Sequence, residues 1–331
     1  MDIEDLASRL VQEGGRRHDP KYIKSLYERQ KRVNESIIDF VGQSIIPVGA
    51  RVLDACAGPG GLASAGAIDK WWVVSNDLAR QFALEVKEKF KGSVVVSSAT
   101  DLPYANGSFG AVFYVYAINN ILRVGRVISE TERILGDGGV MVVSDPGPSV
   151  WMSEVLLHWA AGGYEKSIEY FQNKDYSYED YAAFVAKEFL GVPDDELKAK
   201  IHQINARATT TQDKKSVPFR VRELLEELYL NNLFSKAREN GFVLEKAGVG
   251  VTALGQKTSP SDEQVWLSLA NIHPINADLE EYKSIIGRIM DLRKNPGLIP
   301  GVSEDMVRSP QRIVYPVLVF RKQIGEHSSA N

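Results

Sequence analysis

Short apolar runs alternate with amphipathic segments along the first half of the chain. Five of these runs have the pattern of buried strands, and they span residues 51–54, 72–77, 93–97, 111–116 and 140–144. The segments between them, at residues 62–68, 78–90 and 118–135, have the apolar spacing of helices. Strands that alternate with helices indicate a parallel, doubly wound α/β sheet with helices on both faces.

The remainder of the chain follows a different pattern. Apolar residues recur near the 3.6-residue period between residues 22 and 40, and residues 150–240 are helical in pattern and rich in aromatic residues. Strand character returns at residues 241–245 and 313–320. We therefore predict a seven-stranded, Rossmann-like sheet. The chain would divide into an N-terminal helical segment at 1–45, an α/β core at 46–149 and a helical cap insertion at 150–240. The last core strands would follow at 241–325, with a second insertion at about 256–310.

Composition narrows the class of protein. Of the 331 residues, 44% are hydrophobic and 25% are charged, and the formal net charge is −4, as in ordinary globular proteins. No apolar run approaches the ~18 residues of a membrane span, and the first five residues are acidic, unlike a secretory signal. The single cysteine and the five scattered histidines offer no disulfide and no metal-ligand spacing. These features predict a cytoplasmic protein without a metal, and the acidic balance disfavours nucleic acid as a partner.

A glycine-rich turn follows the first predicted strand. Gly58-Pro59-Gly60-Gly61-Leu62-Ala63 fits the pattern G-x-G-x-x-G/A, and Asp77 ends the second predicted strand 19 positions after Gly58. This arrangement suits NAD or another adenosine-bearing cofactor, and a turn without a ligand is the alternative. Asp54 favours a cationic cofactor over a pyrophosphate, because opposite charges 4 Å apart gain ~4 kcal/mol at an effective dielectric of 20.

Several motifs occur in an order and spacing that resemble the class I S-adenosylmethionine-dependent methyltransferases. Residues 52–60 resemble their hydrophobic–Asp–x–Gly–x–Gly–x–Gly motif, and residues 76–78 resemble the acidic end of their second strand. Residues 101–109 are similar to the loop and fourth strand of the UbiE-like subgroup, which has a methyltransferase-11-type core. Residues 132–139 are similar to the Arg-x-Leu-x-x-Gly-Gly step into strand five.

The resemblance implies S-adenosyl-L-methionine as cofactor, S-adenosyl-L-homocysteine as product, and a set of binding residues. The backbone around the turn would hold the methionine part, Asp77 the ribose and Leu78 the adenine, with Ser98 and Ala99 at the adenine edge and Val115 completing the pocket. The turn residues are Asp54, Ala55, Cys56, Ala57, Gly58 and Gly60. Three positions depart from the family: Cys56 replaces a glycine, and Ser98 and Gly110 each replace an Asp. These departures bear on how tightly the cofactor is bound.

No short motif names catalytic residues, because methyl transfer needs alignment and desolvation of the acceptor more than a strong base. Asn119 or Asn120 could orient an acceptor or cap a helix. Asp145 could be a general base or a turn residue. His158 could face the pocket or pack on its helix, and the aromatic cluster at 151–184 could form a lid or the core of the cap.

The leading hypothesis is a methyltransferase acting on O, N or C of a small molecule, aromatic or anionic, held between core and cap. Residues 16–32 carry a local charge of +5, from seven Lys and Arg against two acids. They are a solvated helix face, a site for an anionic acceptor, or the basis of an RNA or protein methyltransferase. A homologue that binds S-adenosylmethionine without methylating is a further alternative, and a homodimer is left open.

Overall fold

The computed structural model describes residues 20–58, 60–90, 92–145, 147–148, 156, 178–254, 267–276, 278–279, 281–308 and 313–324. The strands are β1 (Arg51–Ala55), β2 (Trp72–Asp77), β3 (Ser93–Val96), β4 (Phe109–Val115), β5 (Leu135–Ser144), β6 (Phe242–Leu254), β7 (Leu267–Pro274) and β8 (Ile313–Lys322). The α-helices are α2 (Pro20–Val41), α3 (Gly61–Ser64), α4 (Arg80–Phe90), α5 (Val124–Ile134), α8 (Tyr178–Phe189), α9 (Asp194–Ala206), α10 (Thr211–Glu239), α11 (Tyr282–Lys294) and α12 (Glu304–Arg308). Short 3₁₀ turns lie at Ala67–Asp69, Ile118–Asn120 and Pro296–Leu298.

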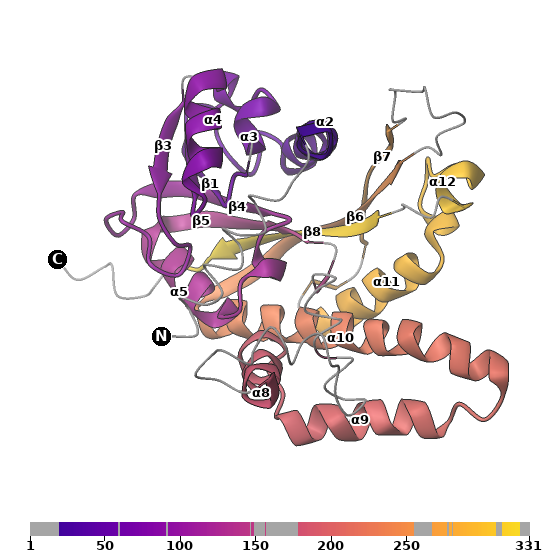
Figure 1. Ribbon diagram of the computed structural model, residues 1–331. Helices are drawn as coiled ribbons and strands as arrows, with labels where there is room; N and C mark the ends of the chain where they lie inside the picture. The colour runs from indigo at the N-terminus through magenta and orange to yellow at the C-terminus, as the bar shows by residue number, and fades with distance from the viewer. Residues whose placement is uncertain are drawn as a thin grey trace.

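One mixed sheet organises the fold (Figure 1). Its strand order is β3-β2-β1-β4-β5-β8-β6-β7. The first five strands are parallel, and β8 joins β5 and β6 in antiparallel register. The strand order reverses between β1 and β4, which creates the kind of edge where open α/β sheets bind ligands.

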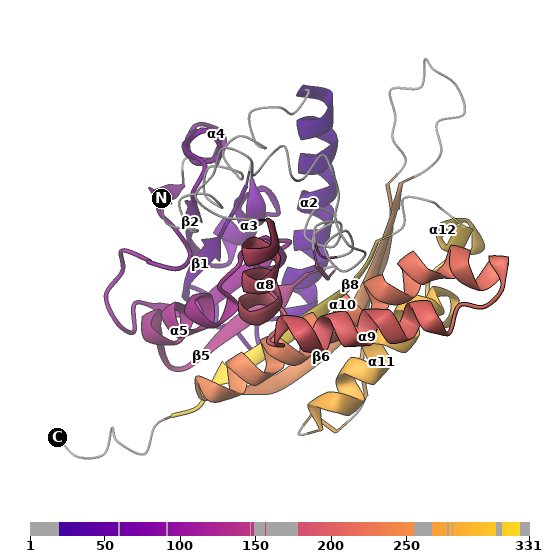
Figure 2. The same ribbon diagram turned by 60° about the horizontal axis from the view of Figure 1, so that its bottom comes forward.

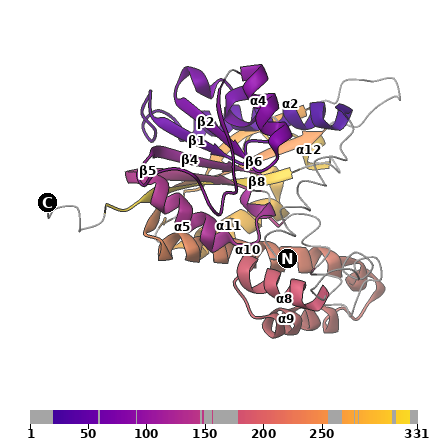
Figure 3. The ribbon, with the colours of Figure 1, turned by 60° about the vertical axis from the view of Figure 1, so that its left-hand side comes forward.

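Alternating side chains of the parallel strands supply two hydrophobic cores. Val52, Val73 and Phe113 pack with α2 and α3 on one face, whereas Leu53 and Tyr114 pack with α5, α8, α10 and α11 on the other. Figure 3 shows these helices above and below the sheet. Both faces are buried, as expected for parallel strands with apolar residues at nearly every position. The predicted α/β sheet with helices on both faces is confirmed.

The helices between β5 and β6 extend from one face of the sheet. Helix α10 is 29 residues long and contacts α5, α9 and α11, and its first turn is closed by a capping box between Thr210 and Asp213. Helices α8 and α9 lie beyond α10, away from the sheet (Figures 1 and 3). No helix in the described ranges is both long and apolar enough to cross a membrane.

The prediction of seven strands was wrong, because the described residues form a sheet of eight strands. The additional strand, β7, lies within the predicted second insertion and pairs with β6 in antiparallel register. Strand β6 itself continues to Leu254, well beyond the predicted range of 241–245. Its interior glycines lie where other side chains need the space: a Cβ on Gly250 would lie 2.3 Å from Cζ of Tyr315.

The helices predicted at 62–68 and 118–135 are shorter in the structure, and a 3₁₀ turn replaces part of each. In place of a helix over 62–68, α3 ends at Ser64 and a 3₁₀ turn follows Gly66, whose φ of +73° interrupts the helix. In place of a helix over 118–135, a 3₁₀ turn at Ile118–Asn120 precedes α5, which begins at Val124. In both places the chain turns before a regular helix can continue.

Arg133 on α5 forms hydrogen bonds with the loop before β4, so its replacement should destabilise the protein. Its guanidinium donates to the carbonyls of Leu102 (2.8 Å) and Tyr104 (2.6 Å) and pairs with Glu130. We expect Arg133→Ala to lower the free energy of unfolding by about 2 kcal/mol, because two carbonyls lose charged donors. Arg308→Ala is the control, since Arg308 pairs with Glu304 on the surface, and we expect a change within about 0.5 kcal/mol. Urea unfolding measures both, and equal losses would contradict the prediction.

Candidate functional site

Four adjacent strands bring the predicted cofactor residues to one edge of the sheet. Asp54 and Ala55 end β1, Asp77 ends β2, and Val115 ends β4. Ser98 and Ala99 follow β3, and Leu78 follows β2. Because these strands are parallel and neighbours, their carboxyl ends meet. The structure therefore gathers the whole predicted set at one place, and the role of each residue stays a prediction.

The glycine-rich turn folds tightly over Asp54. The Oδ2 atom of Asp54 accepts a hydrogen bond from the Leu62 N–H at 2.7 Å. Gly61 has a φ of +37°, and a Cβ there would lie 1.9 Å from the same oxygen. Cys56 has a φ of +59°, a left-handed conformation in which glycine is the usual residue. The family's glycine at this position therefore matches the backbone, and the cysteine carries some strain.

Asp77 lies beside this turn and holds it from the second strand. Its Oδ2 atom accepts from the Gly58 N–H at 2.8 Å, and its Oδ1 atom accepts from the Ala79 N–H at 2.7 Å. Each carboxylate oxygen has two acceptor positions, so both oxygens keep capacity for a hydroxyl. The hydrogen bond from the Gly58 N–H thus joins the glycine-rich turn to Asp77, which lies 19 residues later in the sequence.

The acids at this edge are buried together. Burial raises the pKa of Asp54 to about 7, against the hydrogen bond from the Leu62 N–H, and the charge of Asp77 raises it further. Burial also raises the pKa of Asp77, partly offset by the Ala79 and Gly58 N–H groups. Burial, and then the charges of Asp77, Asp54 and Asp145, raise the pKa of the Cys56 thiol well above its usual value. A thiol in this setting is a poor nucleophile.

The two other family departures have simple local structures. The Ser98 hydroxyl is 2.8 Å from the Thr100 hydroxyl and accepts from the Thr100 N–H at 3.2 Å, so it organises its own loop. Gly110 lies in β4, where a Cβ would be 3.7 Å from the nearest atom, the Cβ of Ala50. A side chain at residue 110 would therefore fit, and neither departure blocks the edge of the sheet.

The catalytic candidates after β4 and β5 contact one another. Asn119 is buried and donates from Nδ2 to the Gly147 carbonyl at 3.0 Å. Asn120 donates to the Tyr116 carbonyl at 3.3 Å and to Oδ1 of Asn119 at 2.8 Å. Neither asparagine is the N-cap of α5, which is Arg123. The Asn119 side chain instead joins the loop after β4 to the loop after β5, and Asn120 donates to that side chain.

Asp145 is almost fully buried, with 1% of its surface exposed. Its Oδ1 atom accepts from the Ala117 N–H at 2.8 Å and its Oδ2 atom accepts from the Tyr229 hydroxyl at 3.0 Å. Burial raises the pKa of Asp145 to about 7, while these hydrogen bonds and the charge of Arg293 lower it. Asp145 is therefore a buried, hydrogen-bonded carboxyl, and its role as a general base or as a turn residue stays a prediction.

Sequence reasoning missed Tyr229 on α10 and Arg293 on α11. Arg293 donates to the Asp145 carbonyl at 3.4 Å and lies 2.9 Å from Oε2 of Glu226. These residues lie 84 and 148 positions from Asp145, and no local motif signals such a contact. His158, the basic residues up to position 29, and the aromatic cluster up to and including Tyr178 lie outside the residues whose side chains the structure describes.

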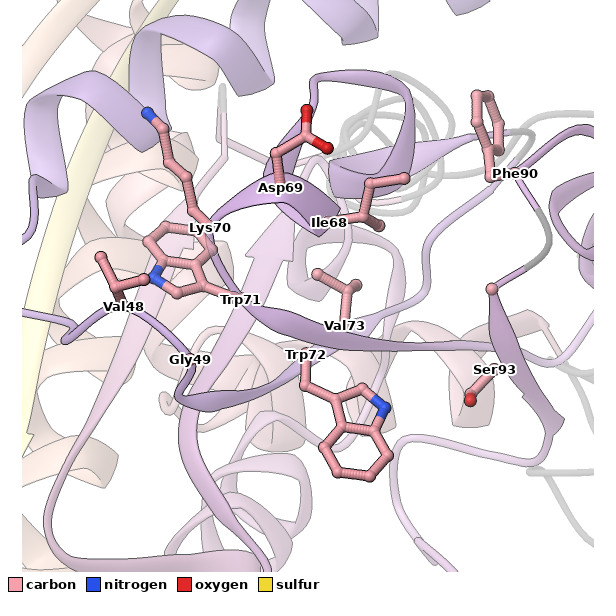
Figure 4. A pocket seen from close by; sticks show the side chains of 11 residues that line it. Val48, Gly49, Ile68, Asp69, Lys70, Trp71, Trp72, Val73, Phe90 and Ser93 are labelled. Carbon is pink, nitrogen blue, oxygen red and sulfur yellow. The ribbon is translucent and has the colours of Figure 1, made fainter.

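A shallow pocket lies at the opposite edge of the sheet. Trp72 and Ser93 begin β2 and β3, and with Val48, Ile68 and Phe90 they line it (Figure 4). Trp72 is 68% exposed there. Because this pocket borders the amino ends of the strands, it is separate from the edge that carries Asp54 and Asp77.

The residues at the carboxyl edge fit S-adenosylmethionine. Two buried carboxyl groups, Asp54 and Asp77, have no Lys or Arg ion pair among the described side chains, so a sulfonium cation nearby would favour their ionised forms. The backbone approaches closely at Gly61, and Asp77 has acceptor capacity for ribose hydroxyls. In the described ranges, no group of three or more His, Cys, Asp or Glu residues could hold a metal ion.

Comparison with known proteins agrees with this geometry. Residues 53–143 match the methyltransferase domain family. The chain is 31% identical over 107 residues to the ubiquinone/menaquinone biosynthesis C-methyltransferase UbiE of Desulfotalea psychrophila, covering 31% of this chain and 44% of that protein. It is 35% identical over 104 residues to the demethylmenaquinone methyltransferase of Beutenbergia cavernae, covering 31% and 43%.

The family match spans residues 53–143 of the chain. The chain spans less than half of the length of the curated relatives it matches. Among solved structures, the YcgJ protein of Bacillus subtilis aligns with a TM-score of 0.41 at 13% identity, over 88% of this chain and 99% of that one. Residues 53–143 are therefore similar to a methyltransferase domain, and the order of the motifs around Asp54 and Asp77 agrees with that match.

Proposed function

We propose that the protein transfers the methyl group of S-adenosylmethionine to an oxygen, nitrogen or carbon atom of a small molecule. The observation that carries the proposal is the joined arrangement of Asp54, the glycine-rich turn and Asp77 at the carboxyl edge. When bound, the cofactor supplies an electrophilic methyl group on a sulfonium. The turn backbone would hold its methionine part, Asp77 its ribose, and Leu78, Ser98 and Ala99 its adenine.

The acceptor would lie between the core and the inserted helices. Asn119 follows β4, the neighbour of β1, and Asp145 follows β5, the next strand. Residues of α10 and α11 contact Asp145. These residues exclude water from the reacting atoms and fix the loops that would border the acceptor, which is the main requirement of an in-line displacement. One of the relatives is a demethylmenaquinone methyltransferase, so demethylmenaquinone is the first acceptor to try.

Replacing Asp77 tests the cofactor site. We expect Asp77→Asn to weaken S-adenosylhomocysteine binding about 10- to 150-fold, because the amide loses the charge and one of two acceptor oxygens. Isothermal calorimetry measures the dissociation constant. Asp69→Asn is the matched control, because Asp69 lines the pocket at the opposite edge, and we expect it to bind as the unchanged protein does.

Three results would count against the proposal in different ways. No binding of either cofactor form by the folded protein would end it, and equal binding by Asp77→Asn would remove Asp77 from the site. Binding without release of S-adenosylhomocysteine, when S-adenosylmethionine is supplied with a cell extract, would favour the non-methylating alternative. Loss of turnover on charge reversal of Arg16, Arg17 and Lys21, with steep salt dependence, would favour an RNA or protein acceptor.

A further inference from the structure

A buried polar cluster joins both inserted regions to the carboxyl end of β5. We call it the β5-end cluster and define it as Asp145, Asn119, Glu226, Tyr229 and Arg293. Tyr229 and the Ala117 N–H hold the Asp145 carboxylate, Arg293 contacts both the Asp145 carbonyl and Glu226, and Asn119 holds the Gly147 carbonyl. Residues of α10, of α11 and of the loop after β4 therefore meet at Asp145 and Gly147, in the loop after β5.

The helices present the right faces for this contact. Glu226 and Tyr229 are three residues apart on α10, so they lie on the same side of that helix. Arg293 is near the end of α11, which packs against α10, and Figures 1 and 2 show the two helices side by side below the sheet. The cluster therefore depends on the packing of α10 with α11, and neither helix could form it alone.

The cluster is costly for a purely structural contact. The side chains of Arg293 and Glu226 are 8% and 18% exposed, and burying such a pair costs about as much desolvation energy as its attraction returns. Gly147 has no room for a side chain, since a Cβ would lie 2.9 Å from Cγ of Glu226 and 3.0 Å from Nη1 of Arg293. Apolar residues would join these helices at lower cost, so the polar groups point to a role at the site.

The cluster also reaches the cofactor turn. Burial, and then the charges of Asp77, Asp54 and Asp145, raise the pKa of the Cys56 thiol, so the charge of Asp145 acts on a residue of the cofactor turn. Ala117 and Asn119 lie two and four residues after Val115, the last residue of β4, so the cluster includes one of the asparagines predicted to orient an acceptor. The groups that face Asp145 are Tyr229 from α10, Arg293 from α11 and Cys56 from the turn, with Glu226 behind Arg293.

We propose that Tyr229 and Arg293 are positioning residues that favour the ionised form of Asp145 and fix its orientation beside the acceptor. The two insertions would thereby control the same carboxylate, each through one side chain. The proposal rests on the proposed function for its role in the reaction, but the control of Asp145 by these two residues is a property of the protein alone. It can therefore be measured without cofactor or acceptor.

Carbon-13 NMR of protein labelled at the aspartate carboxyl carbons tests it. The resonance that is absent from Asp145→Asn belongs to Asp145, and we expect it to titrate with a pKa of about 7 in the unchanged protein. In Tyr229→Phe the midpoint should rise by about one pH unit, because the carboxylate loses a hydrogen bond that favours its charged form. In Arg293→Gln it should also rise, and Arg293→Lys should restore it in part by keeping the positive charge.

Two control variants separate this effect from general disturbance of the helices. Tyr282→Phe removes a hydroxyl from α11, where the ring stacks on Phe234, and Arg288→Gln removes a cation that pairs with Asp291 on the same helix. Both should leave the Asp145 midpoint unchanged. If Arg293→Gln does not fold, Tyr229→Phe and Arg293→Lys still decide the question.

Unchanged midpoints in Tyr229→Phe and in the Arg293 variants would overturn the proposal, as would equal shifts in the two controls. A second arm measures S-adenosylhomocysteine binding of the same variants by calorimetry. Failure of the unchanged protein to bind would refute the proposed function while the titration result stands. Shifted midpoints with retained binding would support positioning on the acceptor side rather than a role in holding the cofactor.

Discussion

Gly61→Ala should destabilise the protein more than any other glycine-to-alanine substitution at the carboxyl edge of the sheet. The new Cβ would lie 1.9 Å from Oδ2 of Asp54, far inside contact distance, in a backbone with a φ of +37°. Asp54 cannot move aside easily, because it is 2% exposed and the same oxygen accepts from the Leu62 N–H. We expect a loss of about 3 kcal/mol in the free energy of unfolding, from overpacking plus backbone strain.

Gly49→Ala provides the matched control for this prediction. Gly49 also has a positive φ, +79°, but a Cβ there would meet no atom within 4 Å. Its cost should therefore be backbone strain alone, about 1 kcal/mol. Chemical denaturation of the two variants isolates the steric contribution, and similar losses would show that the turn can open. We also expect Gly61→Ala, where folded, to bind S-adenosylhomocysteine more weakly than Gly49→Ala, because the turn is displaced.

The parts of the fold that the sequence predicted well are those with local signals. β2 matches its predicted range from Trp72 to Asp77, because an apolar run there begins after a turn and ends in an acid. Asp54 and Asp77 were placed at strand ends by the same reasoning, and parallel pairing then required them to be neighbours. Periodicity and punctuation carry this information within a few residues of each site.

The parts that were missed depend on contacts between distant residues. The continuation of β6 is difficult to predict because Gly248 and Gly250 weaken the strand pattern. In the structure, the absence of side chains at these two glycines makes room for Phe40, Ile272 and the ring of Tyr315. The partners of Asp145 lie on helices from both insertions. Nothing in the sequence near these partners distinguishes them from other helical residues, since their function arises only from packing.

Stability should fall as the pH rises, because two buried carboxyls resist ionisation. Burial raises the pKa of Asp54 and of Asp145 to about 7, above the ordinary value near 4 that an unfolded chain has. Between these values the folded state binds more protons than the unfolded state, so the free energy of unfolding decreases with pH. We expect a decrease of about 2 to 3 kcal/mol for each carboxyl between pH 5 and pH 8.

Urea unfolding at several pH values measures this dependence, and neutral variants assign it. Asp54→Asn keeps an oxygen to accept from the Leu62 N–H, and Asp145→Asn keeps one for the Ala117 N–H, with the Tyr229 hydroxyl free to turn and accept. Each variant should lose its own share of the pH dependence. Asp305→Asn, an exposed acid on α12, changes the net charge equally and should leave the slope unchanged. A flat profile in the unchanged protein would contradict the prediction.

The pH dependence of stability should also respond to the charge of the bound cofactor, through Asp54. S-adenosylmethionine carries a sulfonium cation, whereas S-adenosylhomocysteine has a neutral thioether, so only the first favours ionised Asp54. Excess S-adenosylmethionine should therefore reduce the loss of stability between pH 6 and pH 8, and excess S-adenosylhomocysteine should leave more of it. The difference should vanish in Asp54→Asn. If both ligands stabilised the protein equally at every pH, Asp54 would have no electrostatic part in choosing the charged cofactor over its product.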